Sequence, residues 1–134
     1  MKPAYLLAAV ILSFGTASNA WAACGDPAGP GVDWNNCNKS GANLSNAKMS
    51  GANLFSVNLT GANLSGARLR GADLGSTTLT GANLSGADLT YATLAAADLT
   101  RVNLSGAAWV DGRVCDQGSI GVCNIDGVAQ SEPY

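Results

Sequence analysis

Leucine, or a residue that takes its place, returns at every fifth position of one long stretch of the chain. A small residue, usually Ala, stands two positions before each leucine, and Asn or Asp usually comes directly before it. On an α-helix, a period of five scatters the leucines around the surface, and on a strand it sends alternate leucines to opposite faces. A chain that turns a corner every five residues can point all of them inward. The inward positions are Leu44, Met49, Leu54, Leu59, Leu64, Leu69, Leu74, Leu79, Leu84, Leu89, Leu94, Leu99, Leu104 and Trp109.

A second period of twenty indicates how many sides each coil has. Residues twenty apart agree better than residues five apart, and twenty is four times five, so we expect a four-sided coil whose turns stack around a shared core. Stacked residues would lie about 4.8 Å apart, and like polar side chains could form hydrogen-bonded ladders. Fourteen sides make about 3.5 coils, or a repeat region about 17 Å tall. The surface ladders expected are Asn43, Asn63, Asn83 and Asn103, beside Ser45, Ser65, Ser85 and Ser105.

The repeat Ala-Asn/Asp-Leu-Ser/Thr-Gly resembles the pentapeptide-repeat family over residues 42–111 without a gap. The resemblance implies an all-β fold, the right-handed quadrilateral β-helix. The departures are local: Thr77, Thr78, Thr93 and Ala108 replace the usual Ala or Asn/Asp. Arg70 and Tyr91 take positions where the repeat prefers Ser, Thr or Gly, and none of the departures interrupts the inward column.

Residues 1–22 have the features of a secretory signal. Lys2 supplies a positive start, an apolar run follows over residues 4–14, and Ala20-Trp21-Ala22 fits a small-x-small cleavage site. The apolar run is too short to span a bilayer. We expect cleavage after Ala22 and a periplasmic or extracellular protein. The predicted organisation is a signal peptide at 1–22, an N-terminal cap at 23–40, the β-helix at 41–111, and a C-terminal cap and tail at 112–134.

Four cysteines in an exported chain indicate two disulfides. Cys37 and Cys115 would lie nearly four coils apart, about 19 Å along the axis, whereas disulfide partners need Cα atoms within about 7 Å. The predicted pairs are therefore Cys24 with Cys37 and Cys115 with Cys123. Cys24 also lies close to the cleavage site, which leaves a lipid anchor on this residue as an alternative that the bulky Trp21 disfavours.

The ends of a solenoid need lids, because each exposes an apolar cross-section and unpaired backbone groups. Trp34 falls in the count of five and can cover the first leucine layer. At the other end Trp109 takes a leucine position, Val114 continues the count, and residues 111–123 fold over the last coil. Residues 124–134 have little apolar content, and we expect them to fray.

The sequence predicts no enzyme and no cofactor. It contains no His, and the carboxylates Asp73, Asp88, Asp98 and Asp111 fall on different sides, so no pair is assembled for acid–base chemistry or for a metal ion. A nucleophilic Ser would need a base and an oxyanion pocket. The glycines lie at corners, where a residue without Cβ eases the turn.

Charge argues against nucleic acid as a partner. Removing residues 1–22 leaves six basic and nine acidic residues, a net charge of −3, and the repeat region holds four of each sign. Some members of the resembled family mimic duplex DNA and inhibit DNA gyrase, but a DNA mimic needs ordered negative charge, and a signal peptide would remove the protein from gyrase. A further alternative is ice or surface binding, suggested by a stacked column of hydroxyl residues twenty apart: Ser40, Thr60, Thr80 and Thr100. The preferred interpretation is a rigid interaction or structural module of the cell envelope with an unidentified protein or envelope partner.

Overall fold

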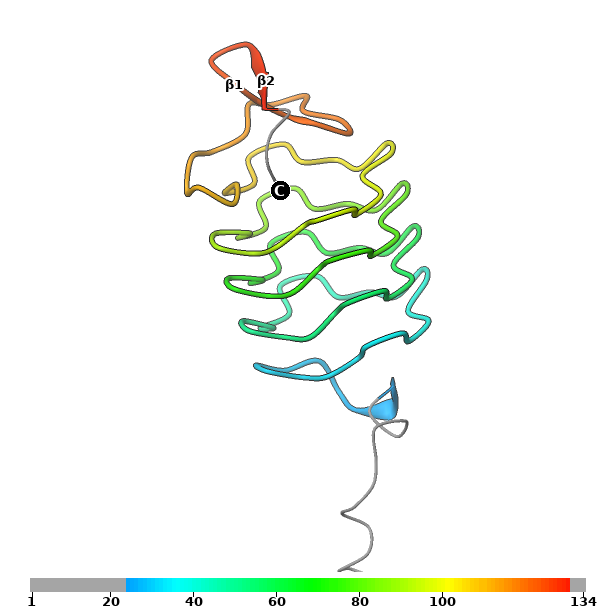
Figure 1. The fold of residues 1–134 in the computed structure, drawn as a ribbon. Coiled ribbons are helices and arrows are strands. Elements are labelled where there is room, and N and C mark those ends of the chain that lie inside the picture. Colours follow the sequence, from blue (N-terminus) through cyan, green and yellow to red (C-terminus); the bar gives the residue numbers. More distant parts are fainter. Residues whose placement is uncertain (1–23, 131–134) are drawn as a thin grey trace, which may run out of the picture.

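The computed structural model describes residues 24–130, so the signal segment at 1–22 and the last four residues lie outside the described part. These residues form a stack of similar coils with a β-hairpin at one end (Figure 1). Residues twenty apart lie side by side: Asn43 forms a parallel bridge with Asn63, Asn63 with Asn83, and Asn83 with Asn103. One coil is therefore twenty residues long, which is the longer of the two sequence periods.

The coils are joined by short parallel bridges. The N–H of Leu44 donates to the carbonyl oxygen of Asn63 (2.7 Å), and the N–H of Asn46 donates to that of Ser65 (2.8 Å). A corner interrupts each side before a longer ladder can form. Within the described residues, regular strands occur only in the terminal hairpin, as β1 (Cys123–Ile125) and β2 (Val128–Gln130). The β character of the coils thus comes from isolated bridges.

Each corner is a four-residue turn closed by a backbone hydrogen bond. At one of them the N–H of Ala62 donates to the carbonyl oxygen of Leu59 (3.0 Å), and Gly61, the third residue of the turn, has φ +67°. Positive φ at this position favours Gly, because a Cβ is crowded there. The repeated Gly of the sequence therefore marks the corner. Corners that use another residue instead are at Asn36, Asn46, Ser56, Ser76, Tyr91, Ala96 and Arg101.

The core is a single column of leucines with alanines beside them. All fourteen residues at the fifth positions are buried, with exposed fractions between 0% and 9%. Thr77 replaces an Ala and is fully buried, but its hydroxyl donates to the carbonyl oxygen of Leu54 (2.7 Å). This bond removes the cost of burying the hydroxyl without a partner, so the departure from the repeat leaves the core intact.

The N-terminal end is closed by a disulfide and a buried tryptophan. Cys24 and Cys37 are bonded, with Cα atoms 5.5 Å apart, and Trp34 is 2% exposed. The indole N–H of Trp34 donates to the carbonyl oxygen of Asp26 (3.1 Å). Lys39 takes a fifth position, where its Nζ donates to the carbonyl oxygen of Cys24 (2.6 Å) and lies 4.0 Å from the Trp34 ring centre. Lys39 can face inward here because it meets the lid instead of another coil.

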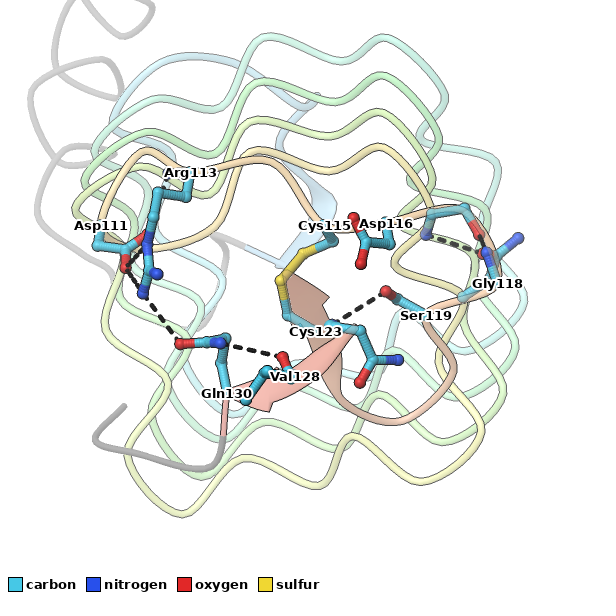
Figure 2. Close-up of a disulfide and its surroundings, with 12 residues drawn as sticks. Asp111, Arg113, Cys115, Asp116, Gly118, Ser119, Cys123, Val128 and Gln130 are labelled. Atoms are coloured by element: carbon cyan, nitrogen blue, oxygen red, sulfur yellow. Dashed lines mark hydrogen bonds and ion pairs between the residues drawn. A yellow bond between two sulfur atoms is a disulfide. The ribbon is translucent and has the colours of Figure 1, made fainter. Parts of the chain in front are cut away.

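The C-terminal end is closed by a chain reversal. After Trp109, the N–H of Gly112 donates back to the Trp109 carbonyl oxygen (2.8 Å), and Val114 pairs with Ala108 in an antiparallel bridge. The prediction that Val114 continues the count of five was wrong: the chain has already turned back, and Val114 is 58% exposed. The second disulfide, Cys115–Cys123, is buried over the last coil (Figure 2).

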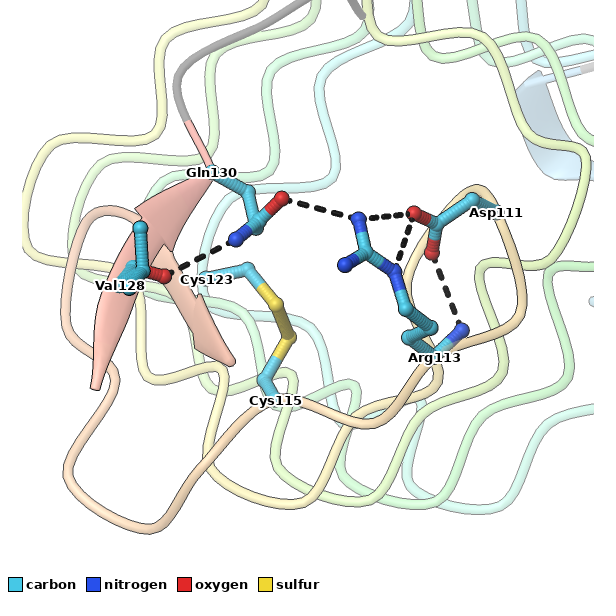
Figure 3. Close-up of polar contacts among 6 residues, drawn as sticks. All are labelled: Asp111, Arg113, Cys115, Cys123, Val128 and Gln130. Carbon is cyan, nitrogen blue, oxygen red and sulfur yellow. Dashed lines mark hydrogen bonds and ion pairs between the residues drawn. A yellow bond between two sulfur atoms is a disulfide. The ribbon is translucent and has the colours of Figure 1, made fainter. Parts of the chain in front are cut away.

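The expectation that the chain frays from residue 124 was also wrong for residues 124–130, whereas residues 131–134 lie outside the described part. β1 and β2 pair in antiparallel register, with Cys123 opposite Gln130 and Ile125 opposite Val128. Asp126 and Gly127 between them both have positive φ, 53° and 79°, as the tightest two-residue hairpin turns require. The Gln130 side chain accepts a hydrogen bond from Arg113 (2.9 Å), which is itself paired with Asp111 (Figure 3). The hairpin is therefore tied to the rod.

Candidate interaction surface

The outer surface of the rod consists of four sides, each defined by the residues that bridge along it. The parallel bridges fix them as follows: the first side has Asp33, Asn53, Asp73 and Thr93; the second has Asn38, Asn58, Thr78 and Asp98; the third has Asn43, Asn63, Asn83 and Asn103; and the fourth has Lys48, Arg68, Asp88 and Ala108. These are the neighbours that the twenty-residue period predicts for the three carboxylates Asp73, Asp88 and Asp98.

The column of the third side is uncharged, and its Asn side chains accept hydrogen bonds from residues of the same coil. The side-chain oxygen of Asn63 accepts from the N–H of Ser65 (3.0 Å) and from the Ser65 hydroxyl (2.8 Å). The same bond from the N–H two residues on is made at Asn43, Asn83 and Asn103. The expected ladder residues are thus stacked at the backbone, while these side-chain oxygens stabilise the corner within their own coil.

The carboxylates also accept local hydrogen bonds. Asp73 accepts from the N–H of Gly75 (2.9 Å) and from the Thr93 hydroxyl (3.0 Å). Hydrogen bonds from Thr90 lower the pKa of Asp88, with smaller contributions from Arg70 and Arg68. A general acid at neutral pH needs a raised pKa, so the contacts of Asp88 favour an ordinary ionised surface group at that position.

The pKa values of the remaining two carboxylates are lowered as well. Hydrogen bonds from Thr100 and then Thr80 lower the pKa of Asp98, and hydrogen bonds from Arg113 lower that of Asp111. Within the described part of the chain, no three His, Cys, Asp or Glu residues gather as metal ligands would.

The fourth side and the corner after it carry three of the four cations of residues 41–111. Lys48 and Arg68 follow one another in adjacent coils, and Arg70 lies two residues beyond Arg68. All three are exposed. In residues 24–130 the only ion pair is Arg113–Asp111, so none of the three cations is neutralised by direct pairing.

Tyr91 lies at the corner that follows the fourth side. Its side chain is 67% exposed, and its backbone has φ 63° where most corners have Gly. The Arg70 guanidinium lies 4.6 Å from the ring centre. Sequence analysis identified Tyr91 only as a departure from the repeat and missed this contact. The signal was present, because Tyr91 lies twenty positions after Gly71 and thus one coil above the residue next to Arg70.

Phe55 is the other large apolar residue on the coils that is exposed, at 42%. Its ring packs onto Gly75 in the next coil, where a Cβ would lie 3.0 Å from a ring carbon. Gly75 therefore provides the space that lets the ring lie against the rod. The Phe55 ring thus packs against the surface of the rod, whereas a larger fraction of the Tyr91 side chain is exposed to solvent.

The family model for pentapeptide repeats matches residues 31–66 and 67–106, which is 36 plus 40 residues and more than half of the 134. The chain belongs to the pentapeptide-repeat family. Members of this family fold as right-handed quadrilateral β-helices, and the four-sided coils described above agree with that architecture.

Solved pentapeptide-repeat structures include two similar proteins from the cyanobacterium Nostoc PCC 7120. HetL, which is involved in heterocyst differentiation regulation, is 35% identical over 61% of this chain and 42% of its own, with a TM-score of 0.39. A second is 38% identical over 57% of this chain and 64% of its own, with a TM-score of 0.41. QnrB1, a plasmid-mediated fluoroquinolone resistance protein, is 21% identical over 63% and 56%, with a TM-score of 0.34. This chain thus spans less than two thirds of each, and no curated protein matches it.

Two observations bear on membrane attachment. Among residues 24–130 there is no helix with the length and apolar character needed to cross a bilayer. The Cys24 sulfur is bonded to Cys37, so it cannot carry a lipid thioether while that disulfide is intact. In this pentapeptide-repeat protein the Cys24 sulfur therefore belongs to the N-terminal lid.

Proposed function

We propose that this protein is an exported, non-enzymatic module of the cell envelope that presents a rigid rod of about 3.5 right-handed coils to a partner. The observation that carries the proposal is the pair of disulfides at the two ends of the rod. Disulfides form and persist in oxidising compartments, and every cysteine of the sequence is used in one. The signal features at 1–22 support the same compartment.

The surface supports a binding role more than catalysis. Carboxylates are dispersed over different sides, and those with perturbed pKa values have them lowered. Pentapeptide-repeat proteins are in general structural or binding modules. A stiff rod whose side chains are fixed by corner hydrogen bonds offers a partner a preorganised surface, which reduces the entropy lost on association.

Cell fractionation combined with mass spectrometry tests the proposal. We expect the mature chain to begin at Ala23, to lie in the periplasm or medium, and to carry two disulfides and no acyl group. A full-length, reduced chain in the cytosol would overturn export and return attention to gyrase inhibition, which a DNA supercoiling assay would then test. The exposed Lys48, Arg68 and Arg70 argue against that alternative, because they place positive charge where a DNA mimic needs negative charge.

A further inference from the structure

The charges of the rod are distributed unevenly over its four sides. The fourth side and the corner after it hold three exposed cations, Lys48, Arg68 and Arg70, with Asp88 as the one carboxylate in the same column. The first side has Asp33 and Asp73 in its column, and the third has only Asn. A rod with no net charge over its repeats thus has one face that is locally positive.

Asp88 compensates this face only in part. Its side-chain oxygen accepts the N–H of Thr90 (3.0 Å), and no ion pair joins it to Arg68 or Arg70 in the described residues. The Asp88 carboxylate therefore accepts a hydrogen bond within its own corner. Arg68 and then Lys48 precede Asp88 along the column, so an anion bound at that end of the column would lie next to two positive charges.

Tyr91 adds a flat aromatic surface to the positive face. A bulky residue with φ 63° is strained relative to the Gly found at most corners, and strain of this kind collects at functional sites. Arg70 lies against the ring by a cation–π contact. The contact orients the guanidinium, and the ring remains 67% exposed for a further partner.

We infer that Lys48, Arg68, Arg70 and Tyr91 form a binding face for a linear acidic polysaccharide. Lys48 and Arg68 occupy the same column in successive coils, at the strand spacing of about 4.8 Å, which suits a polymer that carries a carboxylate on each sugar. Arg binds carboxylates in a planar fork, and a tyrosine ring can pack against the apolar face of a sugar. This inference rests on the proposed binding role and names the chemistry of the partner.

Two other anionic partners fit the face less well. Surface binding to anionic lipid normally needs a cluster of four to eight basic residues, and the face has three. Duplex DNA carries one negative charge per about 1.7 Å of its axis, a charge density that two cations about 4.8 Å apart in successive coils do not match.

The test uses the purified, oxidised mature chain at low ionic strength. Calorimetry measures binding to a short oligogalacturonate, which has one carboxylate per sugar, and to its methyl ester, which has the same backbone without the charge. Phosphatidylglycerol vesicles form a third arm. The variants are Arg68→Gln, Arg70→Gln, Asp88→Asn and Tyr91→Gly. The matched control is Arg101→Gln, which removes one exposed cation at a corner after the second side.

We expect the oligogalacturonate to bind at least about tenfold more tightly than its ester. Arg68→Gln and Arg70→Gln should each weaken binding by about three- to five-fold, the upper part of the range for an exposed charge pair, whereas Arg101→Gln should leave it unchanged. Asp88→Asn should strengthen binding. Tyr91→Gly should weaken binding while the melting temperature stays the same or rises, because Gly relieves the backbone strain. That combination separates the ring's role in binding from a role in folding.

Equal binding to the ester, equal loss in Arg101→Gln, or binding to vesicles but not to the oligosaccharide would each overturn the inference. Its failure is distinguishable from failure of the proposed function. A chain that is exported and oxidised but does not bind acidic sugars leaves the envelope role intact, whereas a cytosolic, unprocessed chain contradicts that role whatever the purified protein binds.

Discussion

Leu64 and Leu84, in the middle of the rod, have a coil above and below them and are fully buried, whereas Leu44 and Leu99, near its ends, are 9% and 7% exposed. In the middle, each coil is covered by another copy of the same pattern. At the ends, the cover comes from segments that do not repeat: a disulfide-closed loop under Trp34, and a reversed chain with a hairpin over the last coil.

This difference teaches how the two parts are stabilised. A repeat contacts only its neighbours, so the middle gains its stability from leucine burial and from backbone bonds between coils. An end has one neighbour and must hold its lid by other means, here covalently. We therefore expect the middle to be sensitive to lost side-chain volume and the ends to be sensitive to reduction.

The largest expected effect is in the middle of the core. Leu64→Ala should lower the free energy of unfolding by about 4 kcal/mol, because the coils on both sides prevent the site from collapsing around the cavity. Leu99→Ala should cost about 2 kcal/mol, since the last coil can relax. Urea denaturation of the oxidised proteins measures both values.

Leu64→Met is the matched control for this comparison. Met49 already occupies an equivalent position and is fully buried, and a swap that conserves volume should cost less than about 1.5 kcal/mol. Equal losses in Leu64→Ala and Leu99→Ala would contradict the difference between the middle and the ends.

Removal of either disulfide comes next in size. The bridges span 13 residues at Cys24–Cys37 and 8 at Cys115–Cys123, and chain entropy gives about 3 and about 2.5 kcal/mol for loops of these lengths. The paired Cys→Ala variants should show these losses in urea denaturation.

Reduction supplies an independent check of the disulfides. Dithiothreitol should destabilise the unmodified protein by about the sum of the two losses, because the ends are too far apart to couple. The variant with all four cysteines replaced should not respond. A response in that variant would show that the reductant acts on something other than the lids.

A smaller effect is expected at Thr77, the polar residue within the core. Thr77→Val keeps the shape but removes the hydroxyl that donates to the Leu54 carbonyl oxygen, and should cost about 1 kcal/mol. Thr77→Ala matches the repeat but also removes a methyl group, and should cost about 2 kcal/mol. If Thr77→Val were as stable as the unmodified chain, the buried hydrogen bond would contribute nothing.

The repeating part of this fold could be predicted because the two sequence periods determine the geometry of the coil. A period of five fixes the corners, and a period of twenty fixes which residues are neighbours, as the bridges of Arg68 with Lys48 and Asp88 show. The cysteine pairing followed, since the coil length separates Cys37 from Cys115. The corners, the neighbours and the cysteine pairing all follow from side chains that recur many times, so a single residue that departs from the repeat does not change the prediction.

The ends could not be predicted in the same way, because nothing there repeats. Val114 fits the count of five, but Gly112 had already allowed the chain to reverse. The hairpin did have a local signal, because the pair Asp126-Gly127 favours the two-residue turn. The three-residue strands beside it, however, are too short and too weakly apolar for their sequence to predict strands. At the candidate surface, the three cations were visible in the sequence, and the contact of Arg70 with Tyr91 was not.

The smallest expected effect is a dependence on acid that should differ between the middle and the end. The pKa of Asp88 is lowered in the folded protein, chiefly by hydrogen bonds from Thr90, so its ionised form stabilises the fold. This contribution is present above the unfolded-state pKa of about 3.9 and is lost as the pH falls through the lower folded-state value.

The free energy of unfolding should therefore be flat from neutral pH down to about 5 and decline below about 4. Asp88→Asn should reduce that decline by less than about 1 kcal/mol, since the group is near the surface. Asp111→Asn, at the C-terminal end, should also reduce the decline, because Arg113 lowers the Asp111 pKa. In the unmodified protein, 0.5 M salt should remove only the coulombic part of the Asp111 contribution and leave the hydrogen-bonded part. If Asp88→Asn left the acid limb of the curve unchanged, the hydrogen bonds from Thr90 would not favour the charged carboxylate, and the corner contacts in the middle of the rod would contribute to geometry alone.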